Sequence, residues 1–384
     1  MGEIPQHQEH ILCLLPFPED SKILDRLRQK YNVEITYKQI FFGVGKALEL
    51  ADVPDGKFTH YLAISLSLSS HFPINLASCN YTRYTLILPP SAEKAKNLKL
   101  IHLFSAGTDR LSNTPIWKDT KIPITNSSGV HGPQISEWVI MQILSHSHKE
   151  KLLIEWQKEH VWGDYKRLGA MRDCVGQRLG VLGYGAIGRQ AARISKAMGM
   201  DVIAYTASPR TTPESRKDEG KYIVPNTGDP DGTLPSAWYS GLDKESLHNF
   251  LKQDIDILLI AVPLTPQTHH FLSAAEFEIL GSKTNAFIIN IARGGIINQD
   301  DLITYLKKPL SEGGLRGAAL DVTDPEPLPQ DSELWTLENV AITPHVSGLG
   351  TTYAERSFAI LDANLDNIEK GRNLINLVDR KKGY

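Results

Sequence analysis

Short apolar runs alternate along this chain with stretches in which apolar residues recur about every 3.6 positions. Residues 10–18, 255–264 and 284–295 are apolar runs closed by Pro or Gly, which is typical of buried strands. Residues 19–31 and 350–372 have the apolar spacing of amphipathic helices. Because strands that alternate with helices favour a parallel sheet with crossovers, the pattern predicts an α/β fold.

The alternation runs through two consecutive series of strands. Further strands of the first series are predicted at 33–38, 61–70, 85–90, 98–107 and 122–132. The second series begins at residue 177 and ends with strands at 315–323 and 340–346. Between the two series, residues 133–157 are predicted to form one long, largely apolar helix, which bridges two domains or lies in a subunit interface.

Residues 211–243 break this pattern. They are rich in Pro, Gly, Asp and Ser, which predicts a surface insertion with little regular structure. Such an excursion is either a lid or an elaborated connection between two elements.

The segment GYGAIG has the glycine spacing of a dinucleotide-binding turn, with a strand pattern before it and a helix pattern after it. The first glycine permits the tight turn, the second lets the backbone approach a pyrophosphate, and the third lets the helix pack on the strand. The helix amides then face the phosphates. A glycine-rich turn without a ligand is the alternative. The cofactor-binding residues predicted here are Gly183, Gly185, Ala186, Ile187 and Gly188.

The next strand ends without the carboxylate that usually holds the ribose hydroxyl of NAD. No acidic residue follows Tyr205 until Glu214, whereas Ser208, Arg210 and Thr211 provide two hydroxyls and a guanidinium. Because these groups suit a phosphate dianion, the sequence favours NADPH over NADH. The alternative is that Arg210 is a solvated loop residue.

Three polar residues follow apolar strands after the glycine turn: Arg293, Glu326 and His345. In an open parallel sheet, ligands bind at the carboxyl ends of the strands, so these side chains are expected in one cleft. Arg293 suits a carboxylate or carbonyl oxygen, and His345 titrates near neutrality and can protonate a developing alkoxide. Glu326 can orient the imidazole and raise its pKa. The sequence thus predicts reduction of a 2-keto acid, with hydride from the cofactor.

Composition narrows the remaining classes of function. The chain has 384 residues, enough for two or three domains, and 41 Lys and Arg against 44 Asp and Glu. This near-balance argues against a nucleic-acid partner bound by phosphate neutralisation. The three cysteines, Cys13, Cys79 and Cys174, are far apart, so neither a disulfide framework nor a structural zinc site is expected, and no metal ligand is predicted.

No targeting or membrane signal stands out in the sequence. The amino-terminal residues lack the pattern of a signal peptide, and no apolar run is long enough to span a bilayer. A cytoplasmic protein without a membrane partner is therefore the expectation.

From about residue 97 to 372 the chain resembles the D-isomer-specific 2-hydroxyacid dehydrogenases. The resemblance rests on LKLIHLFSAGTDRL, GVLGYGAIGR, AVPLTPQTHHFL, NIARGGIINQDDL, LDVTDPEPLP and TPHVSG. Two features are most similar to the glyoxylate/hydroxypyruvate reductase branch. They are the segment LDVTDPEPLP and the absence of an acidic residue at the end of the strand that follows the glycine turn. The first hundred residues match only in outline.

The resemblance assigns roles to individual residues. It implies that Arg293 binds substrate, that His345 is the acid/base and that Glu326 is its partner. It implies that amides around Ala106 and Gly107 bind the substrate carboxylate. Asp321 is expected near the nicotinamide carboxamide, and three residues are expected to line the cofactor cleft: Val262, Thr265 and Ile291. Three further residues are weaker candidates for substrate contact: His131, Trp138 and Trp162.

The resemblance also implies two Rossmann-like domains, with the cofactor domain inserted into a discontinuous substrate domain. The predicted substrate domain comprises 1–127 and 348–384, and the dinucleotide domain comprises 128–347. A homodimer is implied, with helix 133–157 as the expected contact.

Several alternatives remain open at this stage. A dinucleotide-sensing corepressor of the C-terminal-binding-protein type shares the fold and the triad but acts by binding peptides. Thr206 stands where such an NAD(H) reader would carry an acid. Phosphoglycerate and formate dehydrogenases are rivals within the enzymes; the first usually has extra regulatory sequence, and the second does not need a Glu–His acid/base pair.

Overall fold

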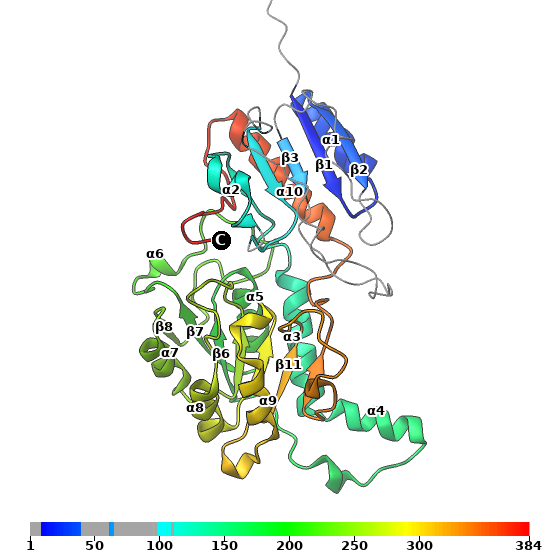
Figure 1. Cartoon of the computed structure of the whole chain (residues 1–384), viewed down its shortest axis with the longest axis vertical. Coiled ribbons are helices and arrows are strands. Elements are labelled where there is room, and N and C mark those ends of the chain that lie inside the picture. The colour runs from blue at the N-terminus through cyan, green and yellow to red at the C-terminus, as the bar shows by residue number, and fades with distance from the viewer. Residues whose placement is uncertain are drawn as a thin grey trace, which may run out of the picture. The chain divides into compact units, whose positions relative to one another are not determined.

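The computed structural model describes residues 9–39, 61–64, 92, 95, 98–108 and 111–383. The chain divides into two compact units, each built on its own parallel sheet (Figure 1). The first unit comprises Met1–Val130, Gly220–Tyr222 and Thr351–Tyr384, and the second comprises His131–Glu219 and Ile223–Gly350. The predicted α/β class, with one unit inserted into the chain of the other, is confirmed.

The chain passes between the units close to the positions that the sequence suggests. It enters the second unit after Val130 and leaves it after Gly350, against boundaries expected at 127 and 347. The assignment of a substrate role to one unit and a cofactor role to the other stays a prediction.

The first unit contains β1 (His10–Leu15), α1 (Ser21–Tyr31), β2 (Glu34–Gln39), β3 (Tyr61–Ile64), β4 (Leu100–Leu103), α2 (Pro115–Asp119), β5 (Ile124–Thr125) and α10 (Tyr353–Glu369). Its strands are parallel, in the order β2-β1-β3-β4-β5. Leu100 and Phe104 pack against Leu24 of α1 and Phe358 of α10, so the carboxyl-terminal helix completes the core of this unit.

The second unit contains α3 (Gly132–Ser147), α4 (Glu150–Glu159), β6 (Arg178–Leu182), α5 (Ala186–Ala197), β7 (Asp201–Thr206), α6 (Pro213–Arg216), β8 (Ala237–Ser240), α7 (Lys244–Leu251), β9 (Ile257–Ile260), α8 (Ala274–Thr284), β10 (Phe287–Asn290), α9 (Gln299–Lys307), β11 (Gly317–Leu320) and β12 (Val340–Ile342). Its parallel strands run in the order β12-β11-β10-β9-β6-β7-β8. The chain order therefore reverses between β6 and β9, and the carboxyl ends of these strands are where a ligand of such a sheet binds.

The apolar runs of the sequence are explained by burial on both faces of this sheet. In β9, Leu258 belongs to the core under α7, α8 and α9, while Leu259 belongs to the core under α3 and α5. Phe250 and Phe277 fill the first core, and Val139 packs in the second. A strand covered on both faces has no polar side to alternate with, so it is apolar throughout.

The predicted single helix at 133–157 is corrected to two helices. α3 ends at Ser147 and α4 begins at Glu150, because Lys149 adopts a left-handed conformation with φ of +58°. The His148 amide donates to Leu144 O at 2.8 Å and closes the last turn of α3. Residues 145–150 carry no aliphatic side chain whose burial would hold one continuous helix.

The expectation of an irregular surface insertion at 211–243 is also corrected. α6 and β8 lie within it, and β8 pairs in parallel with β7 as the edge strand of the larger sheet. Asp229 is only 5% exposed, and Gly220–Tyr222 belongs to the first unit. The polar composition is misleading because its buried groups are hydrogen-bonded within the protein rather than to water.

Some predictions fall outside the described residues. The strand expected at 85–90 and Cys79 are among these. Cys13 and Cys174 are buried free thiols. Among the described residues, no helix is long and apolar enough to cross a membrane.

Candidate functional site

His345 and Glu326 form a hydrogen-bonded pair at the carboxyl edge of the larger sheet. Nδ1 of His345 lies 2.8 Å from Oε1 of Glu326, and their side chains are 40% and 31% exposed. Glu326 follows β11 and His345 follows β12, which are neighbouring strands. Because the carboxylate engages Nδ1, the ring nitrogen available for proton exchange with a ligand is Nε2.

A buried aspartate fixes the loop that carries His345. The Asp321 carboxylate is 2% exposed and accepts hydrogen bonds from Thr343 Oγ1 at 2.6 Å and the Val346 amide at 2.9 Å. It also accepts from the Ser347 amide at 3.0 Å and the Ser347 hydroxyl at 2.5 Å. These bonds hold His345 in a left-handed conformation with φ of +57°. The expected contact of Asp321 with a nicotinamide stays a prediction.

Arg293 follows β10 and is positioned by Asn290, a buried residue at the end of that strand. Nδ2 of Asn290 donates to Arg293 O at 3.0 Å, and its Oδ1 accepts from the Ala292 amide at 3.1 Å. Arg293 Nη1 donates to Ala292 O at 2.7 Å. The three predicted catalytic residues thus follow β10, β11 and β12, which are consecutive in the sheet, and lie at the same edge.

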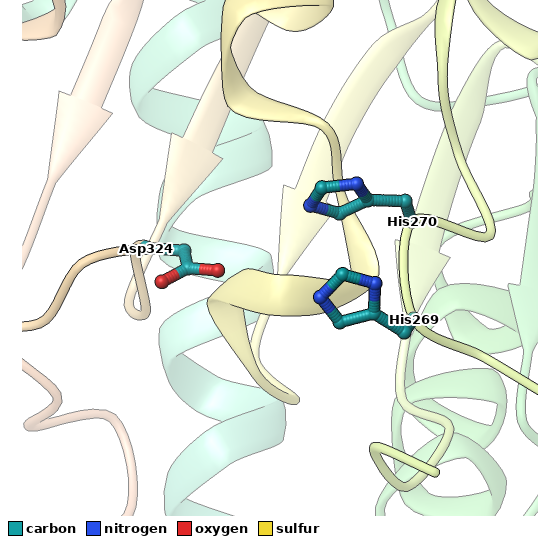
Figure 2. A group of neighbouring side chains, drawn as sticks. All are labelled: His269, His270 and Asp324. Carbon is teal, nitrogen blue, oxygen red and sulfur yellow. The ribbon is translucent and has the colours of Figure 1, made fainter. Parts of the chain in front are cut away.

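One group of side chains in the described part of the chain has the composition of a metal site. His269, His270 and Asp324 place their ligand atoms within 4.8 Å of one another, and all three are exposed (Figure 2). The two histidines follow β9 and the aspartate follows β11. The sequence analysis did not predict this group.

The glycine turn between β6 and α5 leaves space where a dinucleotide phosphate is expected. Gly183 has φ of +108°, and a Cβ there would lie 2.6 Å from the carbonyl carbon of Ala261. No atom lies within 4 Å of a Cβ on Gly185, whereas one on Gly188 would lie 2.4 Å from Gly183 O. α5 begins at Ala186 with no side chain capping its amino terminus. The tight turn, the open second position and the close helix packing all fit a pyrophosphate.

The other residues expected in the cofactor cleft lie beside this turn or on the neighbouring strands. The backbone of Val262 borders Gly183, since a Cβ on that glycine would lie 2.7 Å from Val262 N. Thr265 forms a hydrogen bond with Thr268 through their hydroxyl oxygens at 3.2 Å, and Ile291 is 7% exposed after β10. Their contact with a cofactor stays a prediction.

The loop after β7 presents the groups expected to bind a ribose phosphate. Thr206 is the last residue of β7, and its hydroxyl donates to Ser208 O at 2.8 Å. Ser208 and Thr211 are exposed, and Arg210 is half-buried. Nη1 of Arg210 donates to Ser215 O, so its own loop holds the guanidinium.

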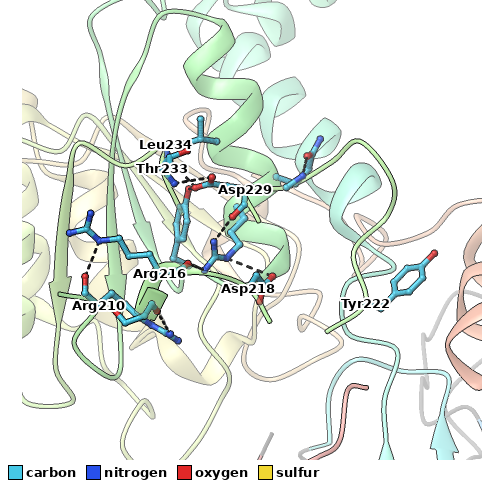
Figure 3. A network of polar contacts seen from close by, with 12 residues as sticks. Arg210, Arg216, Asp218, Tyr222, Asp229, Thr233 and Leu234 are labelled. Carbon is cyan, nitrogen blue, oxygen red and sulfur yellow. Dashed lines mark hydrogen bonds and ion pairs between the residues drawn. The ribbon is translucent and has the colours of Figure 1, made fainter. Parts of the chain in front are cut away.

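A buried polar network ties the following loop to the glycine turn (Figure 3). Arg189 of α5 is 3% exposed; its guanidinium donates to Asp229 O at 2.5 Å and to Arg216 O at 2.6 Å. Nε of Arg189 lies 3.7 Å from Oδ2 of Asp218. The hydroxyl of Tyr184, inside the glycine turn, donates to Asp229 Oδ2 at 2.7 Å and its pKa is raised by burial and by this carboxylate. The loop between β7 and β8 is therefore anchored to the glycine turn.

Ala106 and Gly107 belong to the first unit. Asn126 Nδ2 donates to Ala106 O at 2.8 Å, and Ser105 Oγ donates to Gly107 O at 3.1 Å. Within the described part of the chain, the amides of Ala106 and Gly107 donate to no protein acceptor. Their contact with a substrate carboxylate stays a prediction.

The weaker substrate candidates have different surroundings. His131 Nδ1 lies 3.1 Å from Gly348 O at the start of α3. Trp138 is 7% exposed and packs in the core between α3 and the sheet, so helix packing accounts for it. Trp162 is fully exposed after α4.

The residues that position the site were not predicted from the sequence. Asn290, Thr343 and Ser347 are polar residues at the ends of apolar strands or just after them, and Asp321 was assigned a ligand contact rather than the loop contacts seen here. A buried polar residue beside a predicted catalytic one is the signal that would have found them. The burial of Asp218 and Asp229 was not predicted, because the polar composition of their loop is typical of a solvated segment.

Comparisons with known proteins identify the family of this chain. The family model described as D-isomer specific 2-hydroxyacid dehydrogenase, NAD binding domain, matches residues 140–227 and 229–347. A glyoxylate reductase of Thermococcus litoralis is 32% identical over 298 residues, covering 75% of this chain and 79% of that protein. A D-3-phosphoglycerate dehydrogenase of Methanocaldococcus jannaschii is 30% identical over 75% of this chain, but the match spans 48% of that protein.

A solved structure extends the likeness to the whole fold. It is an NADPH-dependent glyoxylate/hydroxypyruvate reductase of Sinorhizobium meliloti in complex with NADP and sulfate, with a TM-score of 0.67 and 24% identity, covering 98% of this chain and 100% of that one. This likeness shows a shared fold, and the sequence matches show the family. This chain belongs to the D-isomer-specific 2-hydroxyacid dehydrogenase family, whose members are oxidoreductases.

Proposed function

We propose that this protein reduces a small 2-keto acid, such as glyoxylate or hydroxypyruvate, to the D-2-hydroxy acid with NADPH. The observation that carries the proposal is the His345–Glu326 pair, which lies at the same sheet edge as Arg293 and the glycine turn. A keto acid needs a cation for its carboxylate, a proton donor for its carbonyl oxygen and a source of hydride. The first two needs are met by these side chains.

Three residues share the steps of the proposed reaction. Arg293 holds a carboxylate or carbonyl oxygen through paired hydrogen bonds. Nε2 of protonated His345 gives its proton to the carbonyl oxygen as negative charge develops there, and Glu326 orients the ring and stabilises the imidazolium. When bound, the nicotinamide supplies the hydride. In the reverse direction, neutral Nε2 takes the proton of the hydroxyl group.

The preference for NADPH rests on the loop after β7. That strand ends at Thr206, and the exposed hydroxyls of Ser208 and Thr211 flank Arg210. A carboxylate at this place would repel a 2′-phosphate, whereas hydroxyls and a guanidinium bind it. Initial rates of keto-acid reduction, measured with NADPH and with NADH, test this cofactor preference. Arg210→Ala should chiefly raise the KM for NADPH, and a large wild-type preference for NADH would contradict the assignment.

A homodimer through α3 and α4 is the proposed assembly. α4 and the segment after it project from the body of the second unit (Figure 1). Apolar side chains are exposed along residues 141–162, which we call the exposed apolar arm, and Trp162 is fully exposed. Several exposed apolar side chains on one segment favour a protein contact there. The exposed residues are Met141, Leu144, Leu153, Ile154, Val161 and Trp162.

The substrate is tested by following NADPH oxidation with glyoxylate, hydroxypyruvate, pyruvate and phenylglyoxylate. Turnover of at least one of these acids is expected, and their relative kcat/KM values identify the side group that the pocket accepts. Failure of all four, with tight dinucleotide binding and a stable peptide partner in a pulldown, would instead support a dinucleotide-sensing binding protein.

A further inference from the structure

Two adjacent histidines face an aspartate from a different loop at the carboxyl edge of the larger sheet. Each ring of His269 and His270 presents a nitrogen toward the carboxylate of Asp324 (Figure 2). The three ligand atoms lie within 4.8 Å of one another. Within the described part of the chain, neither backbone nor side-chain groups hydrogen-bond to these three side chains. Three donors that converge without a partner are what a metal ion requires.

The backbone under the two histidines is held by its own hydrogen bonds. The His269 amide donates to Thr265 O at 3.0 Å, and the His270 amide donates to Gly295 O at 2.8 Å. Thr268 Oγ1 accepts from the Thr265 amide at 2.8 Å and so closes the turn. The rings stack with centroids 4.0 Å apart and planes 27° apart, so the two imidazoles lie side by side.

The loop that carries Asp324 approaches the histidines closely because a glycine lies between them. A Cβ on Gly295 would lie 3.3 Å from Asp324 Oδ2 and 3.7 Å from His269 Cδ2. The Asp324 amide donates to Gln299 Oε1 at 3.3 Å, which holds the backbone of this loop against α9. Side-chain rotation alone can therefore adjust the distances among the three donors.

The donor set selects the class of ion. Two imidazole nitrogens and a carboxylate oxygen suit zinc and similar transition metals, whereas magnesium and calcium prefer oxygen ligands throughout. Metal–ligand bonds of about 2.1 Å in a tetrahedral site put neighbouring donors about 3.4 Å apart, which a small rotation from the observed spacing reaches.

We propose that His269, His270 and Asp324 form a binding site for a divalent transition-metal ion of the zinc type. The fourth coordination position of the tetrahedral ion takes water or another small ligand. The ion links the loop after β9 to the loop after β11, which also carries Glu326. The proposal stands independently of the reaction, because it concerns metal binding alone.

The test is a calorimetric titration of the full-length, tag-free protein with Zn²⁺. One equivalent per chain is expected in the wild type. His270→Ala and Asp324→Asn should each weaken binding about 10- to 100-fold, at least the loss that even an outer-shell partner of a metal causes. His160→Ala, which removes an exposed histidine at the end of α4, is the matched control and should bind as the wild type does.

Circular dichroism confirms that each variant is folded, and the near-isosteric Asp324→Asn keeps the test decisive if His270→Ala does not fold. Absence of stoichiometric zinc binding in the wild type would overturn the proposal, as would wild-type affinity in Asp324→Asn. Neither outcome depends on turnover of a keto acid, so this inference and the proposed function fail separately.

Discussion

The Asp321 carboxylate accepts hydrogen bonds from Thr343, Val346 and Ser347, and these bonds hold the loop on which His345 lies. Asp321→Asn replaces one acceptor oxygen with a donor that faces other donors, so the loop must shift. We expect kcat for keto-acid reduction to fall about 100-fold, because a displacement of about 1 Å at a catalytic group has an effect of this size.

The affinity for NADPH, measured by fluorescence titration, distinguishes the two roles of Asp321. A positioning role leaves the dissociation constant close to that of the wild type while kcat falls. A large loss of affinity with an unchanged kcat would show that the carboxylate acts on the cofactor instead.

His102 makes the first unit sensitive to acid. The ring is fully buried and hydrogen-bonds to Thr125 Oγ1 at 3.0 Å and to Ser357 O at 3.1 Å. Burial lowers the pKa of His102 from 6.5 to about 4. Between these values the unfolded chain binds a proton that the folded protein does not, so the free energy of unfolding falls as the pH is lowered from about 6.5 to about 4.

Urea denaturation between pH 7 and pH 4.5 measures this contribution against a His102→Gln variant. For each pH unit of acidification, the free energy of unfolding of the wild type should fall by up to about 1.4 kcal/mol more than that of the variant. The pKa of His146 is also lowered by burial, and that contribution remains in both proteins. Parallel pH dependences would exclude His102 as the source.

The positions of the proposed catalytic residues were more predictable than the residues that support them. Arg293, Glu326 and His345 follow apolar runs, so the rule for carboxyl ends of parallel strands places them at one edge. Thr343 and Ser347 act through Asp321, which follows a different strand and lies 22 and 26 residues away in the sequence. Such contacts depend on the strand order, which the apolar pattern does not specify.

The loop between β7 and β8 is held by a buried polar network. Its anchor is Arg189, whose guanidinium bonds the backbone of Arg216 and Asp229 and pairs with Asp218. Arg189→Met keeps the length of the side chain but removes the cation that faces the buried Asp218 carboxylate and the donors to two backbone carbonyls. We expect a loss of about 3 kcal/mol of stability and a higher KM for NADPH.

Thermal unfolding and steady-state kinetics check this expectation, with Lys196→Met as a control on an exposed position of the same helix. The control should match the wild type in both measurements. If Arg189→Met raised neither the KM for NADPH nor the sensitivity to heat, the loop would not be anchored by this network.

At the same scale, regular strands were easier to predict than their interruptions. Buried strands appear as apolar runs because both faces of each sheet are covered. The break at Lys149 and the edge strand Ala237–Ser240 lack that signal. An edge strand buries less, so its sequence resembles that of a loop.

For the whole molecule, the exposed apolar arm predicts a dimer of twice the 42.7 kDa chain mass. Trp162→Asp should shift light scattering after gel filtration toward the monomer, because a charge in a protein contact is costly to desolvate. Leu242→Asp, at another exposed apolar position of the second unit, should not. A monomeric wild type would contradict the proposed dimer, and a dimer that persists in Trp162→Asp would place the contact elsewhere.

The central claim is that His345 exchanges a proton with a 2-keto acid. The most direct measurement is kcat/KM of His345→Gln with the acid that the wild type reduces best, together with the dissociation constant for NADPH. We predict a fall of about 10²- to 10⁴-fold in kcat/KM with dinucleotide affinity unchanged, since general acid catalysis contributes that much. Turnover close to that of the wild type would contradict the account.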